Sequence, residues 1–425
     1  MRPARALAAV AAAWALALAL GGCGEEAAPG PAAPLQDLES LRREVARFEA
    51  DVLREEAAVA TLRADVAALD ALDAARPPIA LRVRRGPTPE VQDALGVGGG
   101  PPSAHGQRVG KASLAREGGT EATEKAVEAA LHWLARNQEP DGRWLAADSR
   151  FDVSVTALAV LAFLGSGHTH KHAKEPAFRR ALNHGLDALK RARRDDGSIG
   201  FDPRDPDTIV NHALAAQALA DLFAASKDFT VKRYAREAVD FAVAAQNPGL
   251  GWGRGVRSGA DDGGLTGLFV LALAAARAGG LEVPPASFEG ALASLDRAPG
   301  DAAAAGIGVL ARILAGRKPD DAAVQAGLRT LVAAPPAKDD LRPDLAAWCV
   351  DAHAVFQATA SGSPAWKAWN EAFQVALLGR QRRGGGDDGS FDPTDRWGEA
   401  GGRVYATAVA ALALEVYYRL ERPGR

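Results

Sequence analysis

Apolar residues recur at alternating spacings of three and four between positions 38 and 69. The first position of each heptad holds Leu38, Val45, Val52, Val59 and Val66. The fourth position holds Leu41, Phe48, Glu55, Leu62 and Leu69. β-branched residues at the first position with Leu at the fourth favour a parallel two-stranded coiled coil. The pattern predicts a coiled-coil stalk over residues 35–75 and a homodimer, with a trimer or a single amphipathic helix as the alternatives.

The stalk is expected to end at Arg76-Pro77-Pro78, because proline lacks the amide donor and clashes with the preceding turn. Residues 76–119 are rich in glycine, proline and charge, and they include the run Gly98-Gly99-Gly100-Pro101-Pro102. This composition predicts a flexible linker between the stalk and the remainder of the chain.

From residue 120 onward the apolar pattern predicts twelve helices in six pairs, with a period of about fifty residues. The first helices of the pairs begin near Glu121, Glu175, Thr230, Pro285, Asp320 and Ser363. Their partners begin near Asp152, Thr208, Gly264, Asp301, Pro343 and Arg403. A repeated helical hairpin cannot bury its apolar face alone, so the hairpins must stack on their neighbours.

The loop inside the first pair runs from Trp133 to Trp144 and has Gln138, then Gly142, then Trp144. Glycine permits the tight turn, glutamine can bond free backbone groups at the next helix start, and the indole can cover the hairpin end. Weaker copies of this loop contain Asp196 to Phe201, Gln246 with Gly251-Trp252, and Gln381 with Gly389-Ser390-Phe391.

This loop matches the QW motif, and residues 120–420 resemble the prenyltransferase and squalene-oxidase repeat superfamily. Three stretches resemble more closely an uncharacterised bacterial lipoprotein branch of it: Gly167 to Lys171, Ala244 to Pro248 and Gly402 to Thr407. The resemblance implies an all-α fold, a single (α/α)6 toroid of six helical hairpins over residues 120–422. It also implies structural roles for the repeat-loop residues Gln138, Gly142, Trp144, Gln246, Trp252, Gly389 and Phe391.

Composition narrows the classes of partner. The chain has 425 residues, of which 48% are hydrophobic and only 6% aromatic, so the core is expected to be built from Ala, Leu and Val. The 50 basic and 53 acidic residues leave a net charge of −3, which provides no electrostatic footprint for nucleic acid. We therefore expect no nucleic-acid partner.

The N-terminus carries the marks of an export signal: two arginines in Met1–Arg5, an apolar run over Ala6–Leu20, and then Leu20-Gly21-Gly22-Cys23. The last four residues resemble the lipobox of bacterial lipoproteins, which implies lipidation of Cys23. We predict a signal peptide over 1–22, a short tether over 23–34 and a chain anchored by lipid to a membrane of the cell envelope. An uncleaved anchor or a plain signal peptide is the alternative. Cys349 would then be the sole unmodified cysteine, so no intrachain disulfide is expected.

The resemblance suggests two enzyme classes to test. Class II terpene cyclases protonate an alkene with the middle Asp of an Asp-x-Asp-Asp-Thr motif. Here the nearest match is Asp205-Pro206-Asp207-Thr208, in which Pro206 stands at the proton-donor position. Asp261 and Asp262 also lack the upstream Asp, and acids at these places serve as helix caps. We retain Asp207, Asp261, Asp262 and His212 as weak catalytic candidates.

Protein prenyltransferase β subunits bind zinc through an Asp-x-Cys pair and a distant His. The chain has Cys349, Asp351 and His353 on the fifth inner helix. Cys349 and His353 are four residues apart and share a helix face, whereas Asp351 points nearly opposite. A buried cysteine beside a hydrogen-bonded histidine is the favoured interpretation. We predict no cofactor, and these three residues remain weak metal candidates.

These observations favour a non-catalytic envelope lipoprotein whose toroid binds a protein, glycan or lipid. The alternative is an enzyme, either a cyclase-like isomerase or a carbohydrate-active enzyme that pairs Asp207 with Asp261 or Asp262. A cavity that is lined by those acids, His212 and His353, with aromatic walls and raised carboxyl pKa values, would favour the enzyme. A cavity filled by Ala and Leu would argue against it.

Overall fold

The computed structural model describes residues 111–297 and 305–418, together with four isolated alanines. The chain divides into two compact units, Met1–Val91 and Gln92–Arg425. In the first unit the four alanines, which lie inside the expected stalk, are helical and exposed; they are Ala46, Ala50, Ala57 and Ala60. The expected signal peptide, tether, dimeric coiled coil and most of the linker otherwise lie outside the described residues. No helix in the described part is both long enough and apolar enough to cross a bilayer.

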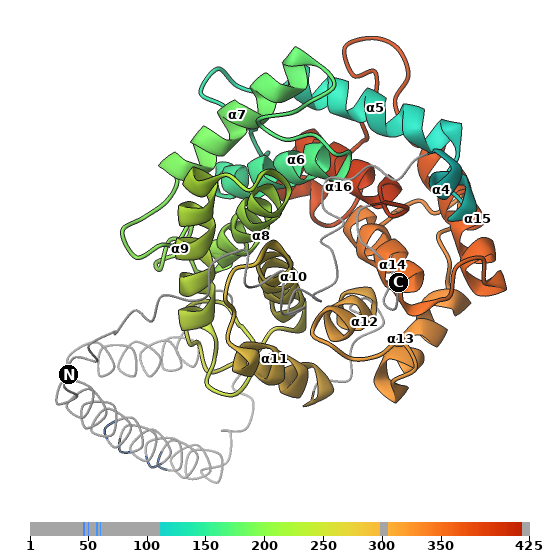
Figure 1. The fold of residues 1–425 in the computed structure, drawn as a ribbon. Coiled ribbons are helices and arrows are strands. Elements are labelled where there is room, and N and C mark those ends of the chain that lie inside the picture. Colours follow the sequence, from blue (N-terminus) through green and yellow to red (C-terminus); the bar gives the residue numbers. More distant parts are fainter. Residues whose placement is uncertain are drawn as a thin grey trace, which may run out of the picture. The chain divides into compact units, whose positions relative to one another are not determined.

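The second unit is a ring of helical hairpins (Figure 1). A short helix, α4 (Lys111–Arg116), precedes it. The outer helices are α5 (Glu121–Arg136), α7 (Pro176–Arg191), α9 (Phe229–Ala245), α11 (Pro285–Arg297), α13 (Ala322–Ala333) and α15 (Pro364–Leu378). The inner helices are α6 (Asp152–Gly165), α8 (Ile209–Ser226), α10 (Gly263–Gly279), α12 (Ala305–Leu314), α14 (Leu345–Ala358) and α16 (Gly398–Leu414). Among the described residues there is no strand, only isolated bridges. The predicted all-α toroid is confirmed.

The ring closes between its first and last hairpins. The last inner helix, α16, packs against α6, and the last outer helix, α15, packs against α5. Every other inner helix packs against the inner helix before and after it, so the six hairpins form one uninterrupted circle (Figure 1). Loops within hairpins, from outer to inner helix, therefore share one rim of the ring, and loops between hairpins share the other.

Apolar residues surround the inner helices, whereas they cover only one side of the outer helices. In α8 every residue from Ile209 to Ala224 is buried except Val210. In α7 the buried residues fall at a helical spacing and charged residues occupy the other side. A helix that is apolar on all sides belongs in an interior, and an amphipathic one belongs at a surface. This difference explains which helix of each pair turns inward.

Side-chain caps begin several helices near their expected starts. Thr120 caps α5 in a capping box with Thr123, and Asp344 accepts a hydrogen bond from the Ala347 amide at 2.9 Å to begin α14. Helix α16 has a break next to its expected start near Arg403, so a helical run does begin there. Its helical residues begin at Gly398, but Gly402 has φ of +70°, a conformation that favours glycine, and it kinks the helix there.

Candidate functional site

The repeat loops use their aromatic residue to bind the two helices of one hairpin. The Trp144 indole N–H donates to the Leu134 carbonyl at 2.8 Å, and its backbone N–H donates to Thr156 Oγ1 at 3.0 Å. Trp252 makes the same pair of bonds at 2.7 and 3.0 Å, with the Ala242 carbonyl and Thr266 Oγ1. Both tryptophans are fully buried, so they close the hairpin end and satisfy its backbone groups.

His212 takes the place of the threonine in the second hairpin. The Phe391 amide donates to Thr407 Oγ1 at 3.1 Å, and the equivalent Ile199 amide donates to His212 Nδ1 at 3.1 Å. His212 Nε2 lies 3.1 Å from the Ala238 carbonyl, so the neutral ring accepts at Nδ1 and donates at Nε2. Burial lowers the pKa of His212 to about 4. This weak catalytic candidate is therefore part of the repeat framework.

In three of the repeat loops a glutamine joins one hairpin to the next. Its amide Nε2 donates both to a carbonyl of its own loop and to a carbonyl of the following outer helix. The pairs of acceptors are Gly142 and Ala181 for Gln138, Leu250 and Ser287 for Gln246, and Gly389 and Ala126 for Gln381. The second acceptor of each pair lies in the neighbouring outer helix: Ala181 in α7, Ser287 in the first turn of α11 and Ala126 in α5.

The glycine of the loop allows that close approach. Gly142 and Gly389 have φ of +87° and +93°, and a Cβ at either place would overlap a backbone carbonyl of the next outer helix, at His184 and Ala129 respectively. Glycine is therefore required there both for its backbone conformation and for space.

The three aspartates singled out by the cyclase comparison serve the loops and helix ends. Asp207 is half exposed and pairs with Arg254. Asp262 caps α10 by accepting from the Leu265 amide at 3.0 Å. Burial would raise the pKa of Asp261, but hydrogen bonds from Asn247, Ser294 and the Gly251 amide outweigh that effect and hold this pKa below its usual range. Asp261 is therefore not poised as a proton donor near neutral pH.

The Cys349, Asp351 and His353 group does not converge on one point. His353 Nδ1 lies 2.9 Å from the Cys349 carbonyl and donates to it, so the ring bonds back to its own helix. Cys349 is half buried and packs against the core. Asp351 lies against α12, where a Cβ on Gly306 would overlap its carboxylate.

A different polar group lies where α14 and α16 begin. Asp395 is buried and accepts hydrogen bonds from the Leu345 amide at 3.0 Å, the Gly398 amide at 2.7 Å and the Tyr405 hydroxyl at 2.8 Å. Burial raises the pKa of Tyr405 well above its usual value, and the charge of Asp395 adds to this rise. The hydroxyl is thus held in its protonated form as a donor to Asp395.

Among the acids of this region, Asp351 has the pKa that is raised most above its usual value. Burial raises the pKa of Asp351 to about 7, and the negative charge of Asp344 adds to the effect. A carboxyl group of this kind exchanges its proton near neutral pH, which is the property required of a general acid or base. The Cys-x-Asp-x-His spacing indicates only a metal ligand at Asp351, because the burial that raises its pKa comes from contact with α12, which no local spacing reveals.

The interior of the ring is not uniform. Helices α6, α8 and α16 are buried on nearly all sides, so side chains fill the ring next to them. Helix α10 instead has a partly exposed stripe of Leu265, Leu268, Leu271 and Ala274. Because α8, α9, α11 and α12 pack on its other sides, this stripe faces the centre of the ring. The side chains of this stripe are all aliphatic, so the part of the inner surface that α10 provides is apolar.

Exposed apolar side chains gather on the rim formed by the loops within hairpins. Four of the six large ones are Leu145, Val256, Leu341 and Trp397, and each precedes an inner helix. Ion pairs link the loops along this rim: Arg150 to Asp205 at 2.9 Å, Arg254 to Asp207, and Arg396 to Asp344 at 3.3 Å. We call this surface the hairpin-loop rim.

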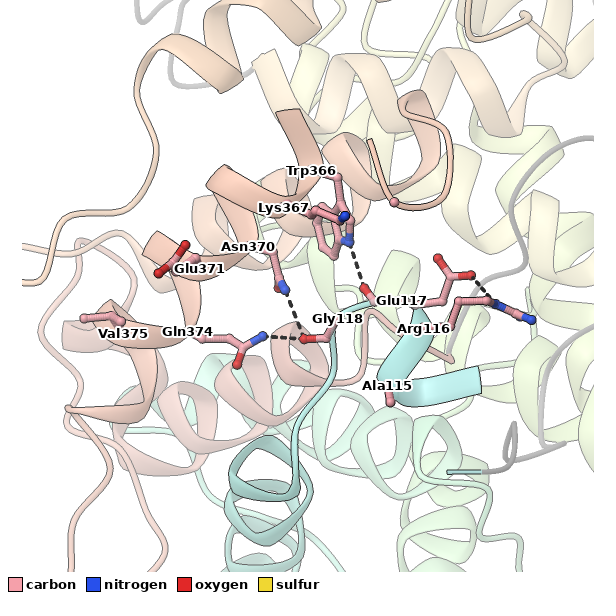
Figure 2. A pocket seen from close by; sticks show the side chains of 11 residues that line it. Ala115, Arg116, Glu117, Gly118, Trp366, Lys367, Asn370, Glu371, Gln374 and Val375 are labelled. Carbon is pink, nitrogen blue, oxygen red and sulfur yellow. Dashed lines mark hydrogen bonds and ion pairs between the residues drawn. The ribbon is translucent and has the colours of Figure 1, made fainter. Parts of the chain in front are cut away.

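A surface pocket of about 320 Å³ lies between α15 and the turn before α5 (Figure 2). Its polar side chains already hold the backbone of that turn: the Trp366 indole donates to the Glu117 carbonyl at 2.8 Å, and the amides of Asn370 and Gln374 donate to the Gly118 carbonyl at 3.1 and 2.7 Å (Figure 2). These bonds fix the start of the first hairpin to the last outer helix. The polar side chains of the pocket are therefore occupied in holding this turn.

No family model and no curated protein matches the chain. Among solved structures, a UGL chain in complex with dGlcA-Glc-Rha-Glc aligns with a TM-score of 0.50 at 15% identity, over 71% of this chain and 100% of the UGL chain. The type II terpene cyclase MstE from Scytonema aligns with a TM-score of 0.49 at 15% identity, over 69% of this chain and 97% of the cyclase. The UGL chain is thus matched over its full length by the ring of hairpins described here. At this identity the likeness concerns the fold alone.

Proposed function

We propose that this chain is a cell-envelope lipoprotein whose toroid is a non-catalytic binding domain, and that the hairpin-loop rim is its protein-binding surface. The observation that carries the proposal is the gathering of exposed Leu and Trp side chains on one rim. Leu341 is 92% exposed and Trp397 is 49% exposed. Protein interfaces are enriched in Trp and Arg, and their central contacts are apolar.

The chemistry of the rim fits a protein partner. Arg396 stacks over the Trp397 ring, with its guanidinium carbon 5.0 Å from the ring centroid, so the two present one flat amphipathic surface. Three Arg–Asp ion pairs lie along this surface, and a partner can exchange with them to form charge-assisted hydrogen bonds of either sign. In contrast, Asp207, Asp261, Asp262 and His212 are used to hold loops and helix ends.

A photo-crosslinking amino acid at Leu341, with a matched one at Phe229, tests the rim. Phe229 is 84% exposed at the start of α9, on the opposite rim, so it reports non-specific contact. In the native host we expect a discrete protein adduct from position 341 that disappears when Trp397→Ser is added. Equal adducts from both positions, or none from position 341, would refute the rim as a binding surface.

The envelope location rests on the signal-like N-terminus and Cys23. A diacylglycerol on Cys23 would hold the chain at a membrane, since lipid chains contribute roughly 0.8 kcal/mol per buried CH₂. We expect Cys23→Ala to shift the chain from the membrane fraction to the soluble fraction, with Cys349→Ala as the control that stays with the membrane. Unchanged membrane retention of the Cys23 variant would contradict lipid anchoring.

The dimeric stalk is tested separately. Sedimentation should show a dimer for the chain without its signal peptide and a monomer after deletion of residues 35–75. A monomer in both cases would rule out the coiled-coil dimer, and a trimer would correct its order.

An enzyme is the second candidate, favoured by the raised pKa of Asp351. Asp351 would act as the proton donor in the ring interior. The oligosaccharide dGlcA-Glc-Rha-Glc is the first substrate to try, because a UGL chain of similar fold holds it. Mass spectrometry of the sugar after incubation with the protein, or with Asp351→Asn, decides between the candidates. Cleavage that Asp351→Asn abolishes supports the enzyme, and an unchanged sugar argues against this activity.

A further inference from the structure

Three side chains on the outside of the ring converge in a way that neither the repeat nor the proposed function requires. Glu128 and His132 lie one helical turn apart on α5, and Glu175 lies at the start of α7. One carboxylate oxygen from each glutamate and one ring nitrogen of His132 all lie within 4.8 Å of one another. Among the described residues this is the one such group of three or more potential ligands.

The surroundings orient these groups toward one another. The His132 ring packs on Phe178, with centroids 4.9 Å apart, and its Nε2 lies 3.4 Å from Glu175 Oε1. Glu175 occupies the N-cap position of α7, yet its side chain makes no capping hydrogen bond. The carboxylate is instead directed at His132, away from the helix end where an N-cap side chain ordinarily bonds.

A cation already occupies one side of the group. Lys174 Nζ lies 2.5 Å from Glu128 Oε1, so the ammonium neutralises one of the two carboxylates. All four side chains are partly exposed to solvent, which allows an ion to enter and Lys174 to move away. The site thus has two negative charges, one imidazole and a removable positive charge.

We propose that Glu128, His132 and Glu175 form a binding site for a divalent transition-metal ion, with Zn²⁺ as the best match. One imidazole nitrogen and two carboxylate oxygens are accepted zinc ligands at about 2.0–2.2 Å, and water would complete a four-coordinate site. Donors around such an ion lie roughly 3.4 Å apart, so rotation of the glutamate side chains is enough to close the group. The ion replaces Lys174 as the partner of Glu128 and links the first hairpin to the second.

The test is a Zn²⁺ titration of the full chain, produced without a histidine tag and stripped with EDTA. Calorimetry should give one site per chain that is weakened at least about tenfold by His132→Gln and by Glu175→Gln, since each removes a ligand. His184→Gln is the matched control, because His184 is an exposed histidine on α7 outside the group, and it should leave the affinity unchanged. Circular dichroism verifies that each variant is folded.

Lys174→Met gives the discriminating result. Because Lys174 competes with the ion for Glu128, its removal should tighten Zn²⁺ binding several-fold, an effect that a merely structural role of these residues would not produce. Substituted Co²⁺ should show visible absorption bands that change in His132→Gln. Zn²⁺ binding that is unaffected by His132→Gln, weaker binding in Lys174→Met, or Mg²⁺ binding as tight as Zn²⁺ would each overturn the proposal.

Discussion

The side-chain amide of Gln381 donates a hydrogen bond to the carbonyl of Ala126, 2.7 Å away and 255 positions earlier in the sequence. This bond joins the loop of the last hairpin to the outer helix of the first. Gln138 makes the equivalent bond to Ala181, 2.9 Å away, between the first and second hairpins. The ring is therefore closed by the same contact that links neighbouring hairpins.

Gln381→Ala should lower the free energy of unfolding by about 1–3 kcal/mol, because it removes two partly buried hydrogen bonds, to the carbonyls of Ala126 and Gly389. Urea denaturation followed by circular dichroism measures the change. Gln325→Ala is the control, since Gln325 Nε2 donates only to the nearby Pro319 carbonyl. An equal effect of the two substitutions would contradict a special role in ring closure.

Gly389→Ala should destabilise the toroid by about 3 kcal/mol or more, because the new Cβ meets the Ala129 carbonyl and the residue has φ of +93°. Gly249→Ala separates the two causes. Gly249 has φ of +66° but nothing within 4 Å of the Cβ position, so its substitution should cost only about 1 kcal/mol. Thermal unfolding of both variants should show a clearly larger loss for Gly389, and equal losses would rule out overlap as the main cause.

His212 should make the toroid less stable in acid. Its pKa is about 4 in the folded chain, below the ordinary value of 6.5, so the unfolded state binds the proton more readily. The stability is full above pH 6.5 and falls by up to about 3 kcal/mol as the pH approaches 4. His212→Thr places in this hairpin the residue found at Thr156, Thr266 and Thr407. The variant should lose less stability between pH 7.5 and 4.5 than the parent protein, as measured by urea unfolding at both values.

Asp351 should make the toroid less stable as the pH rises, which is the opposite of the effect of His212. Its pKa is about 7 in the folded chain against 3.8 ordinarily, so the folded state holds its proton more tightly. The carboxyl contribution is therefore most favourable below pH 4, and stability is lost as the pH rises to 7. Asp351→Asn should be more stable than the parent at pH 8, by up to about 4 kcal/mol, and the difference should shrink at pH 4. A variant that is less stable than the parent at pH 8 would contradict the burial of this carboxyl.

Local patterns were sufficient to predict the hairpins and their loops. Trp144, Gly142 and Gln138 lie within seven residues of one another, and turn chemistry and helix periodicity act over that distance. The helices that are apolar on all sides, such as α8, are recognisable as interior elements for the same reason. The sequence alone therefore determined the fold class, the order of the hairpins and which helix of each pair lies inside.

Only the tertiary structure decided what the polar residues do. His212 looked like a candidate for chemistry, but the Ile199 amide and the Ala238 carbonyl from a neighbouring helix engage both of its ring nitrogens. Asp395 and Glu175 belonged to no motif, yet Asp395 accepts from the Leu345 amide of α14 and Glu175 lies beside His132 of α5. Burial, pKa and ligand geometry arise when ring closure brings distant segments together, and no spacing along the chain specifies those distances.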